Sequence, residues 1–418
     1  MTMFLPMLTL LLPLVLTLPV HAHAGAEVAA IDWSPSGVQA TFGLLLPGED
    51  GLDWVCHEAV TAPDSLLTPG YAASPAGVWL ATVPNRDQAR EMETTLYRSV
   101  DGCAWDAVAG VEPYTVSAVA WVDEAVAVGV TADLISDNNG ILRSSDGGLS
   151  WTEVQPWEGP RLSVGVVAAG SHLWTASFVV DVPDQAQVHH SADGGLTWTH
   201  IDLDLSAVAP ESGSLSVKVL AADGAQAWVG VGVSGGHQLF LVSEQAQGSV
   251  HAEDGSLIDG DVDSQGGVWI VEGNRDLLYS ADGVRFAAVE GGVPAIGLAV
   301  DGDLAMLSSS AILTDHLVFS FTPQGVLSVV YGAEDVAGPL DCPAGTEGAD
   351  ICGPLWAQVL LPAPDTGDGP TEPWVLDTSG QNPGTDEPEG CDCSSLTSTA
   401  GGAWAVLAGL LLVRRRRS

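Results

Sequence analysis

Three aspartates at alternate positions, Asp259, Asp261 and Asp263, form the pattern in this chain that comes nearest to a metal-binding loop. Calcium loops of the helix-loop-helix kind place oxygen ligands at alternate residues, with Gly at the sixth position and Glu at the twelfth. Here those positions hold Ser264 and Ile270. The segment is therefore predicted to be a solvated turn before the strand that contains Trp269, and no metal ligand is assigned.

Carboxylates in pairs could also hydrolyse a glycoside. Residues 25–361 contain 45 Asp and Glu against 8 Lys and Arg, and Lys218 is the single lysine, so the sequence nominates no particular pair. This acidity excludes nucleic-acid binding and indicates solubility rather than calcium affinity. The chain has no His-Glu-x-x-His zinc motif, no Gly-x-Ser-x-Gly motif and no P-loop. No catalytic residue and no cofactor are therefore assigned.

A Ser-x-Asp-Gly-Gly-x-x-Trp motif is repeated along the chain. Its aspartates lie at positions 101, 146, 193 and 282, with steps of 45, 47 and 89 residues, the last being close to twice the first. Decayed copies lie at residues 50–54, near Ser243 and at residues 322–325. The residues assigned to the motif are Ser99, Asp101, Trp105, Ser144, Asp146, Gly148, Trp151, Ser191, Asp193, Gly195, Trp198, Ser280, Asp282 and Phe286.

Short apolar runs keep step with the motif. Each precedes a good or decayed copy, and the runs cover residues 37–42, 77–82, 125–130, 172–177, 226–231, 267–272 and 303–308. A period within about 20–50 residues indicates a solenoid, a propeller or an array. Strand-like runs with Gly-rich turns and no long helical pattern favour an all-β, seven-bladed β-propeller over residues 25–361.

The motif has a mechanical explanation. Asp and Ser side chains can accept hydrogen bonds from backbone N–H groups two or three residues further on, which closes a turn. The glycines supply positive φ angles, and the Trp or Phe then packs between blades. Each residue therefore has a structural role without any catalysis.

The motif resembles the Asp-box, or BNR repeat, of sialidases and related propellers. The resemblance implies that the motif lies on a hairpin between the outer strands of a blade, away from a catalytic face. Sialidases also use three arginines, a Tyr–Glu pair and an acidic Asp. Outside the tail this chain has Arg86, Arg90, Arg98, Arg143, Arg161, Arg275 and Arg285, and no triad can be assigned among them.

Four cysteines in the body are predicted to form disulfides, which suit an oxidising compartment. Cys56 and Cys103 lie one repeat apart, so we expect a bridge between adjacent blades. Cys342 and Cys352 could close a small loop beside the last blade. Six cysteines in the whole chain allow 15 pairings, so this connectivity is a hypothesis.

The N-terminus reads as a secretory signal peptide over residues 1–24, with an apolar run before Ala22-His23-Ala24. No Lys or Arg precedes the run, so an uncleaved anchor is the alternative. Residues 362–390 are rich in Pro, Gly, Asp, Glu and Thr and are predicted to be a disordered linker.

Residues 391–418 resemble the myxobacterial C-terminal sorting tag. The matching parts are Cys391 and Cys393, a short transmembrane helix over residues 400–413, and Arg414, Arg415, Arg416 and Arg417. The resemblance implies export, cleavage of the helix and display at the outer membrane surface of a Gram-negative bacterium. A permanent single-span anchor is the alternative.

Together these features predict a secreted, surface-anchored propeller that acts as a non-catalytic binding module for a glycan or a protein. One alternative is a glycoside hydrolase of the sialidase-like superfamily that uses paired carboxylates. Another is an assembly factor for a membrane complex, since Asp-box propellers occur among photosystem assembly proteins; that is an analogy of fold.

Overall fold

The computed structural model describes residues 29–359, except 63–64, 66–67, 134–137, 158, 160, 180–181, 207–215, 234–235, 254–255, 274–275, 292 and 311–313. The predicted signal peptide, linker and sorting tag all lie outside the described residues. Within the described residues, no helix has the length and apolar character needed to cross a membrane.

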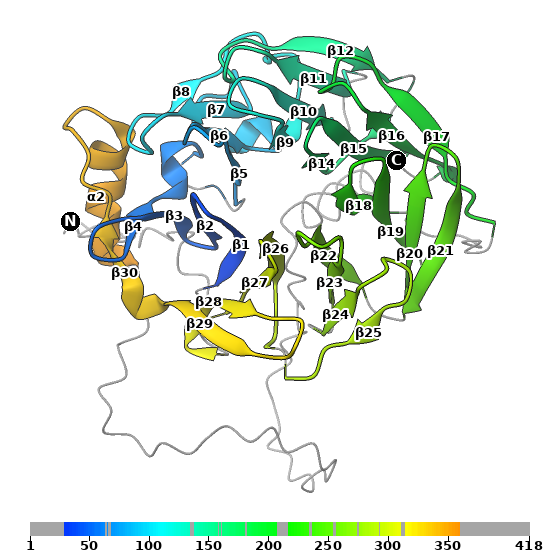
Figure 1. Cartoon of the computed structure of the whole chain (residues 1–418). Helices are drawn as coiled ribbons and strands as arrows, with labels where there is room; N and C mark the ends of the chain where they lie inside the picture. The colour runs from blue at the N-terminus through cyan, green and yellow to red at the C-terminus, as the bar shows by residue number, and fades with distance from the viewer. Residues whose placement is uncertain are drawn as a thin grey trace, which may run out of the picture.

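The described residues form seven antiparallel sheets arranged in a ring, which confirms the all-β, seven-bladed propeller (Figure 1). Blade 1 contains β1 (Ala30–Ser34), β2 (Gly37–Ala40), β3 (Gly43–Pro47) and β4 (Leu52–Val55). Blade 2 contains β5 (Gly70–Ala73), β6 (Trp79–Thr82), β7 (Leu96–Ser99) and β8 (Asp106–Ala107). Blade 3 contains β9 (Val116–Trp121), β10 (Ala127–Thr131), β11 (Gly140–Ser144) and β12 (Thr152–Pro156).

Blade 4 contains β13 (Arg161–Leu162), β14 (Val166–Ala169), β15 (His172–Val179), β16 (Val182–Ser191) and β17 (Thr199–Asp202). Blade 5 contains β18 (Ser216–Asp223), β19 (Gln226–Val233), β20 (Gly236–Ser243) and β21 (Gln247–Glu253). Blade 6 contains β22 (Leu257–Val262), β23 (Val268–Glu272), β24 (Leu277–Ser280) and β25 (Ala287–Ala288). Blade 7 contains β26 (Gly297–Asp301), β27 (Leu304–Ser308), β28 (His316–Phe321) and β29 (Leu327–Gly332).

The first full strand of each blade lies innermost, around the axis of the ring, and contacts the first strand of a neighbouring blade (Figure 1). Each apolar run found in the sequence forms the strand next to the innermost strand of a blade, where both faces are covered by neighbouring blades. Such strands read as nearly continuous apolar runs because neither face meets water. The runs therefore mark the blades one by one.

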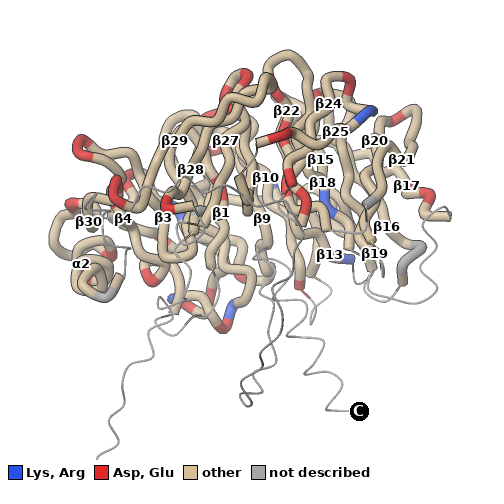
Figure 2. The backbone as a smooth tube through the Cα atoms, turned by 90° about the horizontal axis from the view of Figure 1, so that it is seen from below, with Lys and Arg blue, Asp and Glu red and all other residues tan. Residues whose placement is uncertain are grey.

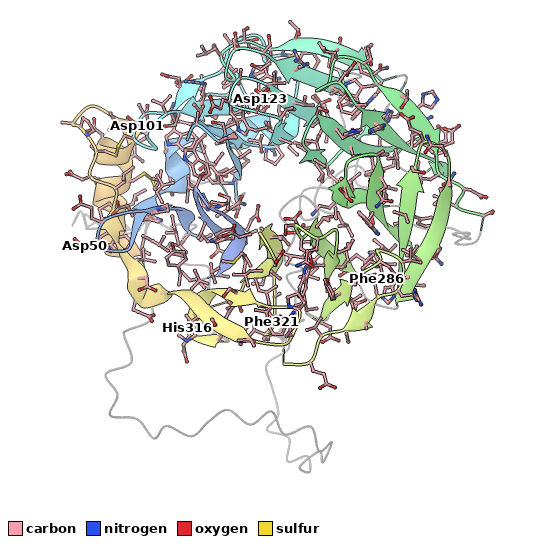
Figure 3. All side chains as sticks on the ribbon, viewed as in Figure 1. Asp50, Asp101, Asp123, Phe286, His316 and Phe321 are labelled. Carbon is pink, nitrogen blue, oxygen red and sulfur yellow. A yellow bond between two sulfur atoms is a disulfide. The ribbon has the colours of Figure 1, made fainter. Side chains whose placement is uncertain are left out.

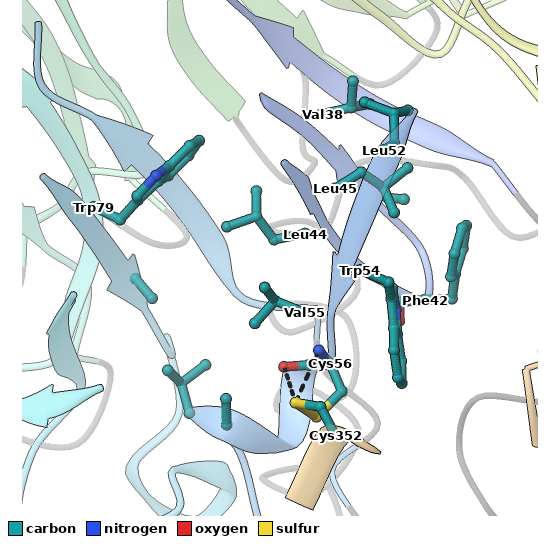
Figure 4. Packing of buried hydrophobic residues seen from close by; sticks show 14 of the residues in the cluster. Val38, Phe42, Leu44, Leu45, Leu52, Trp54, Val55, Cys56, Trp79 and Cys352 are labelled. Carbon is teal, nitrogen blue, oxygen red and sulfur yellow. Dashed lines mark hydrogen bonds between the residues drawn. A yellow bond between two sulfur atoms is a disulfide. The ribbon is translucent and has the colours of Figure 1, made fainter. Parts of the chain in front are cut away.

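The core lies between blades rather than in one central mass. Figure 4 shows the packing of Leu44, Leu45, Val55 and Trp54 of blade 1 near Trp79 of blade 2. Trp54 is 0% exposed, and its Nε1–H donates to the Phe42 carbonyl oxygen at 2.7 Å. Burying a large aromatic side chain contributes about 1.5–3 kcal/mol or more through the hydrophobic effect.

The ring is closed by the segment that follows β29. After η3 (Ala333–Asp335), strand β30 (Val336–Pro339) pairs in parallel with β4, the outer strand of blade 1. The chain then passes through η4 (Gly348–Cys352), α2 (Gly353–Leu355) and η5 (Trp356–Gln358) against blades 1 and 2. Two further short helices, η1 (His57–Ala59) and η2 (Arg86–Gln88), lie in loops.

All four body cysteines form disulfides, but not in the expected pairs. Cys56 bonds Cys352 and Cys103 bonds Cys342. The predicted bridge between Cys56 and Cys103 is wrong, and so is the small loop between Cys342 and Cys352. The physical reason is that the C-terminal segment packs across blades 1 and 2, so that its cysteines meet the cysteines of both blades.

Candidate functional site

The repeated Ser-x-Asp motif lies on the hairpin between the last two strands of blades 2, 3, 4 and 6. We call these hairpins the Ser-Asp turns. In blade 3, Ser144 Oγ donates to Asp146 Oδ1 at 2.8 Å and accepts from the Gly148 N–H at 3.0 Å. Asp146 Oδ1 also accepts from the Ser150 N–H at 2.9 Å, and the Trp151 Nε1–H donates to the Gly148 carbonyl at 3.1 Å.

These hydrogen bonds fix the charge state of the turn aspartates. Bonds from Ser150 lower the pKa of Asp146 to about 2, and bonds from Thr197 do the same for Asp193. Asp282 also has a lowered pKa, mainly through the Arg285 N–H. Asp101 and Phe286 lie toward the outside of the ring (Figure 3). Carboxylates held ionised in turns are poorly suited to donate a proton in catalysis.

The Ser-Asp turns also connect the blades. Arg98 of blade 2 donates from Nε to the Gly147 carbonyl of blade 3 at 2.7 Å. Arg143 of blade 3 repeats the contact with the Gly194 carbonyl of blade 4 at 2.8 Å. The turn glycine Gly195 has a φ of 82° and packs so closely on blade 3 that an added Cβ would lie 2.8 Å from Val128 Cγ2.

The remaining described arginines are also engaged in local contacts. Arg86 donates to the carbonyls of Glu112 and Tyr114, and Arg161 to that of Gln185. Arg90 pairs with Glu347 at 2.7 Å, and Arg285 pairs with Asp282 at 2.8 Å. The six described arginines thus do not converge as a carboxylate clamp would require. Arg275 lies outside the described residues.

Ionisable side chains meet instead on the innermost strands. Lys218 Nζ lies 3.5 Å from Asp259 Oδ1 and donates to the Ile258 carbonyl at 3.1 Å. Strands β18 and β22 contact each other, and Figure 2 marks the basic and acidic positions along the backbone. Asp32, on β1, interacts electrostatically with Asp259, Lys218 and Asp261. We call Asp32, Lys218, Asp259 and Asp261 the axial cluster.

Two carboxyls of the axial cluster have perturbed pKa values. Part of Asp32 is exposed to solvent, yet protein surrounds it, and this desolvation, followed by the charge of Asp259, raises its pKa to about 7. Desolvation raises the pKa of Asp261 to about 6 against the opposing effect of its hydrogen bonds. Ionisable groups perturbed by burial together with specific charged partners are typical of functional sites.

A structural role accounts for part of this arrangement. Asp259 Oδ2 accepts from the Leu298 N–H at 3.1 Å, and Asp261 Oδ2 accepts from the Val300 N–H at 2.8 Å. Both N–H groups belong to β26, whose inner edge has no paired strand among the described residues. Two carboxylates of blade 6 therefore accept hydrogen bonds from backbone N–H groups on the unpaired inner edge of blade 7. Neither Asp32 nor Lys218 contributes to this bonding.

The predicted solvated turn is only partly right, because Asp259 and Asp261 lie on β22 and the chain turns only after the buried Asp263. Asp263 Oδ1 accepts from the N–H groups of Gln265 and Gly267 at 3.0 and 2.7 Å. Asp259 and Asp261 bond β26 instead, so the three carboxylates serve different partners. The described residues contain no group of three or more His, Cys, Asp or Glu side chains placed to hold a metal ion.

Sequence reasoning missed Asp32 and also missed Glu58, a buried residue of η1. Desolvation raises the pKa of Glu58 to about 7, and burial followed by the Glu58 charge raises the pKa of Tyr71. The Tyr71 hydroxyl lies 3.2 Å from His57 Nδ1. A raised pKa disfavours the phenolate that a nucleophilic tyrosine needs. Two sequence features touched the axial cluster, the single lysine and the alternate aspartates Asp259 and Asp261, but neither indicated that these residues lie together with Asp32.

No family model matches the chain, and no curated protein matches it either. Among solved structures, YCF48 from Cyanidioschyzon merolae is similar at 14% identity and a TM-score of 0.49, over 72% of this chain and 97% of that one. YCF48 bound to D1 peptide is similar at 12% identity and a TM-score of 0.40, over 61% of this chain and 79% of that one. A structure from a study of two prolyl endopeptidases is similar at 13% identity and a TM-score of 0.47, over 73% of this chain and 49% of that one. Identities this low concern the fold alone.

Proposed function

We propose that the chain is an exported, non-catalytic binding module whose ligand contacts the axial cluster. The observation that carries the proposal is the meeting of Asp32, Asp259 and Asp261 with the single lysine on strands of three blades. Asp32 is exposed there, and the N–H that it accepts from belongs to the next residue, Trp33, rather than to a neighbouring blade, which suits a group that contacts a ligand.

A protein segment with basic side chains fits this cluster better than a neutral glycan. The chain has a formal net charge of −41, so a cationic partner is attracted over long range and a further anion is repelled. A lysine or arginine of the partner would gain a carboxylate partner in Asp32 and lower its pKa toward the ordinary value.

Peptide and glycan arrays probed with the purified protein test the proposal. We expect saturable binding of Lys- or Arg-containing peptides by the wild type and its loss in Asp32→Asn. Asp106→Asn, at an exposed position on β8, is the matched control because it removes the same charge outside the axial cluster. Equal binding by the two variants would refute the assignment of the site.

A glycoside hydrolase is the second candidate, favoured by the raised pKa values of Asp32 and Asp261. A carboxyl that stays protonated near neutral pH can act as a general acid beside an ionised partner. The sialidase version is disfavoured because the described arginines bond backbone carbonyls or nearby acids. Turnover of an aryl glycoside, lost in both Asp32→Asn and Asp261→Asn, would replace the binding proposal by this one.

The localisation of the protein outside the cytoplasm is also part of the proposal. The two disulfides indicate an oxidising compartment, which supports export through the signal peptide. Mass spectrometry of the mature protein should find an N-terminus at Gly25 and modification or cleavage near Cys391 and Cys393. An assembly-factor role would require co-purification with a membrane complex, and no described contact favours it.

A further inference from the structure

The outer strands of the blades differ in how they protect their open edges. An outer strand presents unpaired N–H and C=O groups, and proteins blunt such edges with short strands, charges, proline or a covering segment. Strand β4 is covered by β30. Strands β8 and β25 have two residues each. Strand β12 carries Glu153 and ends at Pro156, and β17 ends at Asp202.

Strand β29 has fewer of these protections. Its six residues, Leu-Ser-Val-Val-Tyr-Gly, carry no charge and no proline, and it pairs with β28 on one side and with no described strand on the other. Strand β21 is also unpaired on its outer side, but Val250 is its one large apolar residue. The outer edge of β29 is therefore the most apolar open edge among the described strands.

Apolar side chains are exposed along this edge. Val329 is 50% exposed, and Val326, in the turn just before the strand, is 58% exposed. Leu327, Val330 and Tyr331 pack partly against the core clusters of neighbouring blades. The strand is thus anchored from within while its outer side offers backbone hydrogen-bonding groups beside exposed valine methyl groups.

The molecule itself shows that a blade of this ring accepts a fifth strand on its outer edge. Strand β30 pairs with β4 in parallel over three partner pairs, Val336 with Leu52, Gly338 with Asp53 and Pro339 with Trp54, despite a register shift. Strand β29 has a comparable regular stretch, Leu327–Val329, before an extra residue at Val330 interrupts its ladder with β28. A short stretch of paired residues beside a bulge is therefore sufficient to add a strand to the outer edge of a blade in this fold.

Acidic residues adjoin both ends of the strand. The turn before β29 lies against exposed Glu290, because a Cβ added to Gly325 would lie 3.9 Å from the Glu290 carbonyl oxygen. The exposed Glu334 follows directly in η3. A strand added here would meet an uncharged, apolar middle with an exposed acidic residue near each end.

We propose that the outer edge of β29 binds an extended segment of a partner protein as an added β-strand. The segment has β-branched apolar residues in its middle and a lysine or arginine at each end. Main-chain hydrogen bonds supply the affinity and alternate side chains supply the specificity. A second copy of this chain is not the occupant, because two molecules with a net charge of −41 each repel one another.

The probe is a synthetic peptide, Lys-Val-Thr-Val-Thr-Val-Lys, titrated into the full-length protein by calorimetry and amide hydrogen exchange. We expect saturable binding together with slowed exchange within residues 327–332. A peptide N-methylated at alternate residues lacks the donors of one edge and should not bind. Val329→Lys should weaken binding by about tenfold, as an edge lysine blocks strand addition and repels the peptide.

Matched variants separate binding at β29 from a general effect of added charge and from binding at the axial cluster. Val284→Lys introduces the same charge at another exposed valine, on the Ser-Asp turn of blade 6, and should bind the peptide as the wild type does. Asp32→Asn removes the carboxylate of the axial cluster and should still show the slowed exchange within residues 327–332 when peptide is added, so this readout tests the β29 site independently of the axial cluster. Circular dichroism confirms that each variant is folded.

Three results would overturn the proposal. The first is the lack of saturable wild-type binding up to about 1 mM peptide, which corresponds to a binding free energy of about −4 kcal/mol. The second is equal binding of the N-methylated peptide or of Val329→Lys. The third is a concentration-dependent dimer in sedimentation that Val329→Lys abolishes, since a second copy would then occupy the edge.

Discussion

Replacing both disulfides by serine pairs should cost more stability than the two single losses added together. Cys56–Cys352 and Cys103–Cys342 span 296 and 239 residues, and the smaller loop lies inside the larger one. The perturbation is a set of three variants: Cys56→Ser with Cys352→Ser, Cys103→Ser with Cys342→Ser, and all four together. The serine hydroxyls keep the side chains close to their original size.

The magnitude follows from the loops that the bonds close in the unfolded chain. Either bond alone closes a long loop, worth about 5.5 kcal/mol in the chain-entropy model. With that loop closed, the other bond closes a circuit made of the 47 residues from Cys56 to Cys103 and the 10 from Cys342 to Cys352. This smaller circuit is worth about 4 kcal/mol.

Each single loss therefore costs about 4 kcal/mol and the double loss about 9.5 kcal/mol, an excess of about 1.5 kcal/mol over the sum. Residual structure in the unfolded chain lowers the absolute values, so the excess and the equality of the two single losses are the quantities to test. Two local loops, Cys56–Cys103 and Cys342–Cys352, would behave differently. Their losses would be unequal and would add.

Guanidinium unfolding of the four proteins, followed by tryptophan fluorescence, measures the free energies. Peptide mapping under non-reducing conditions verifies the remaining bond in each variant. Reductant should destabilise the wild type and leave the four-serine variant unchanged. Strictly additive and unequal losses would refute the nested connectivity and, with it, the account of how the ring is closed.

Three smaller changes test other parts of the fold and the site. Gly195→Ala should lower the free energy of unfolding at least twice as much as Gly170→Ala, which costs about 1 kcal/mol or more. Both glycines have positive φ, but the new Cβ meets blade 3 only at Gly195, whereas nothing lies within 4 Å of a Cβ at Gly170. Thermal unfolding measures both losses. Arg143→Gln should cost about 1 kcal/mol by removing the Nε–H bond to the next blade, measured by chemical unfolding. Folding raises the pKa of Asp32 to about 7, so the protonated Asp32 carboxyl favours the folded state. This contribution to the free energy of unfolding is complete below about pH 4 and is lost as the pH rises to 7. The wild type should therefore lose stability relative to Asp32→Asn across that range in a pH series of unfolding curves, and a constant difference would contradict the raised pKa.

The ring could be predicted from the sequence because its repeats are local. Each apolar run, such as residues 172–177, forms the strand next to the innermost one, since strands covered on both faces need apolar residues at successive positions. The turn bonds of Ser144 and Asp146 were likewise set by residues close in sequence. Patterns of short range are visible in one sequence without any knowledge of the three-dimensional arrangement.

The closure of the ring and the axial cluster depend on contacts between distant residues. Cys352 meets Cys56 because the last segment crosses the first two blades, and no local pattern encodes that crossing. Asp32 and Lys218 come from blades 1 and 5, and the repeat places them near the axis without a motif of their own. Spacing between neighbouring cysteines therefore gave the wrong pairs, although it identified the right cysteines.

The interface between blades 4 and 5 shows which contacts replace the Ser-x-Asp motif in blade 5, where the motif has decayed. In blades 2 and 3, the residue before the motif serine is an arginine that bonds the turn of the next blade. In blade 4 that residue is His190, and the next blade offers Glu244 in place of an intact turn, with Nδ1 and Oε1 2.9 Å apart. His190 also stacks on Trp174 with ring centroids 4.1 Å apart, and Trp174 Nε1–H donates to the Gly224 carbonyl of blade 5 at 2.8 Å. The contact keeps its place but changes its chemistry, so a blade can lose its motif when its neighbour supplies another way to hold it.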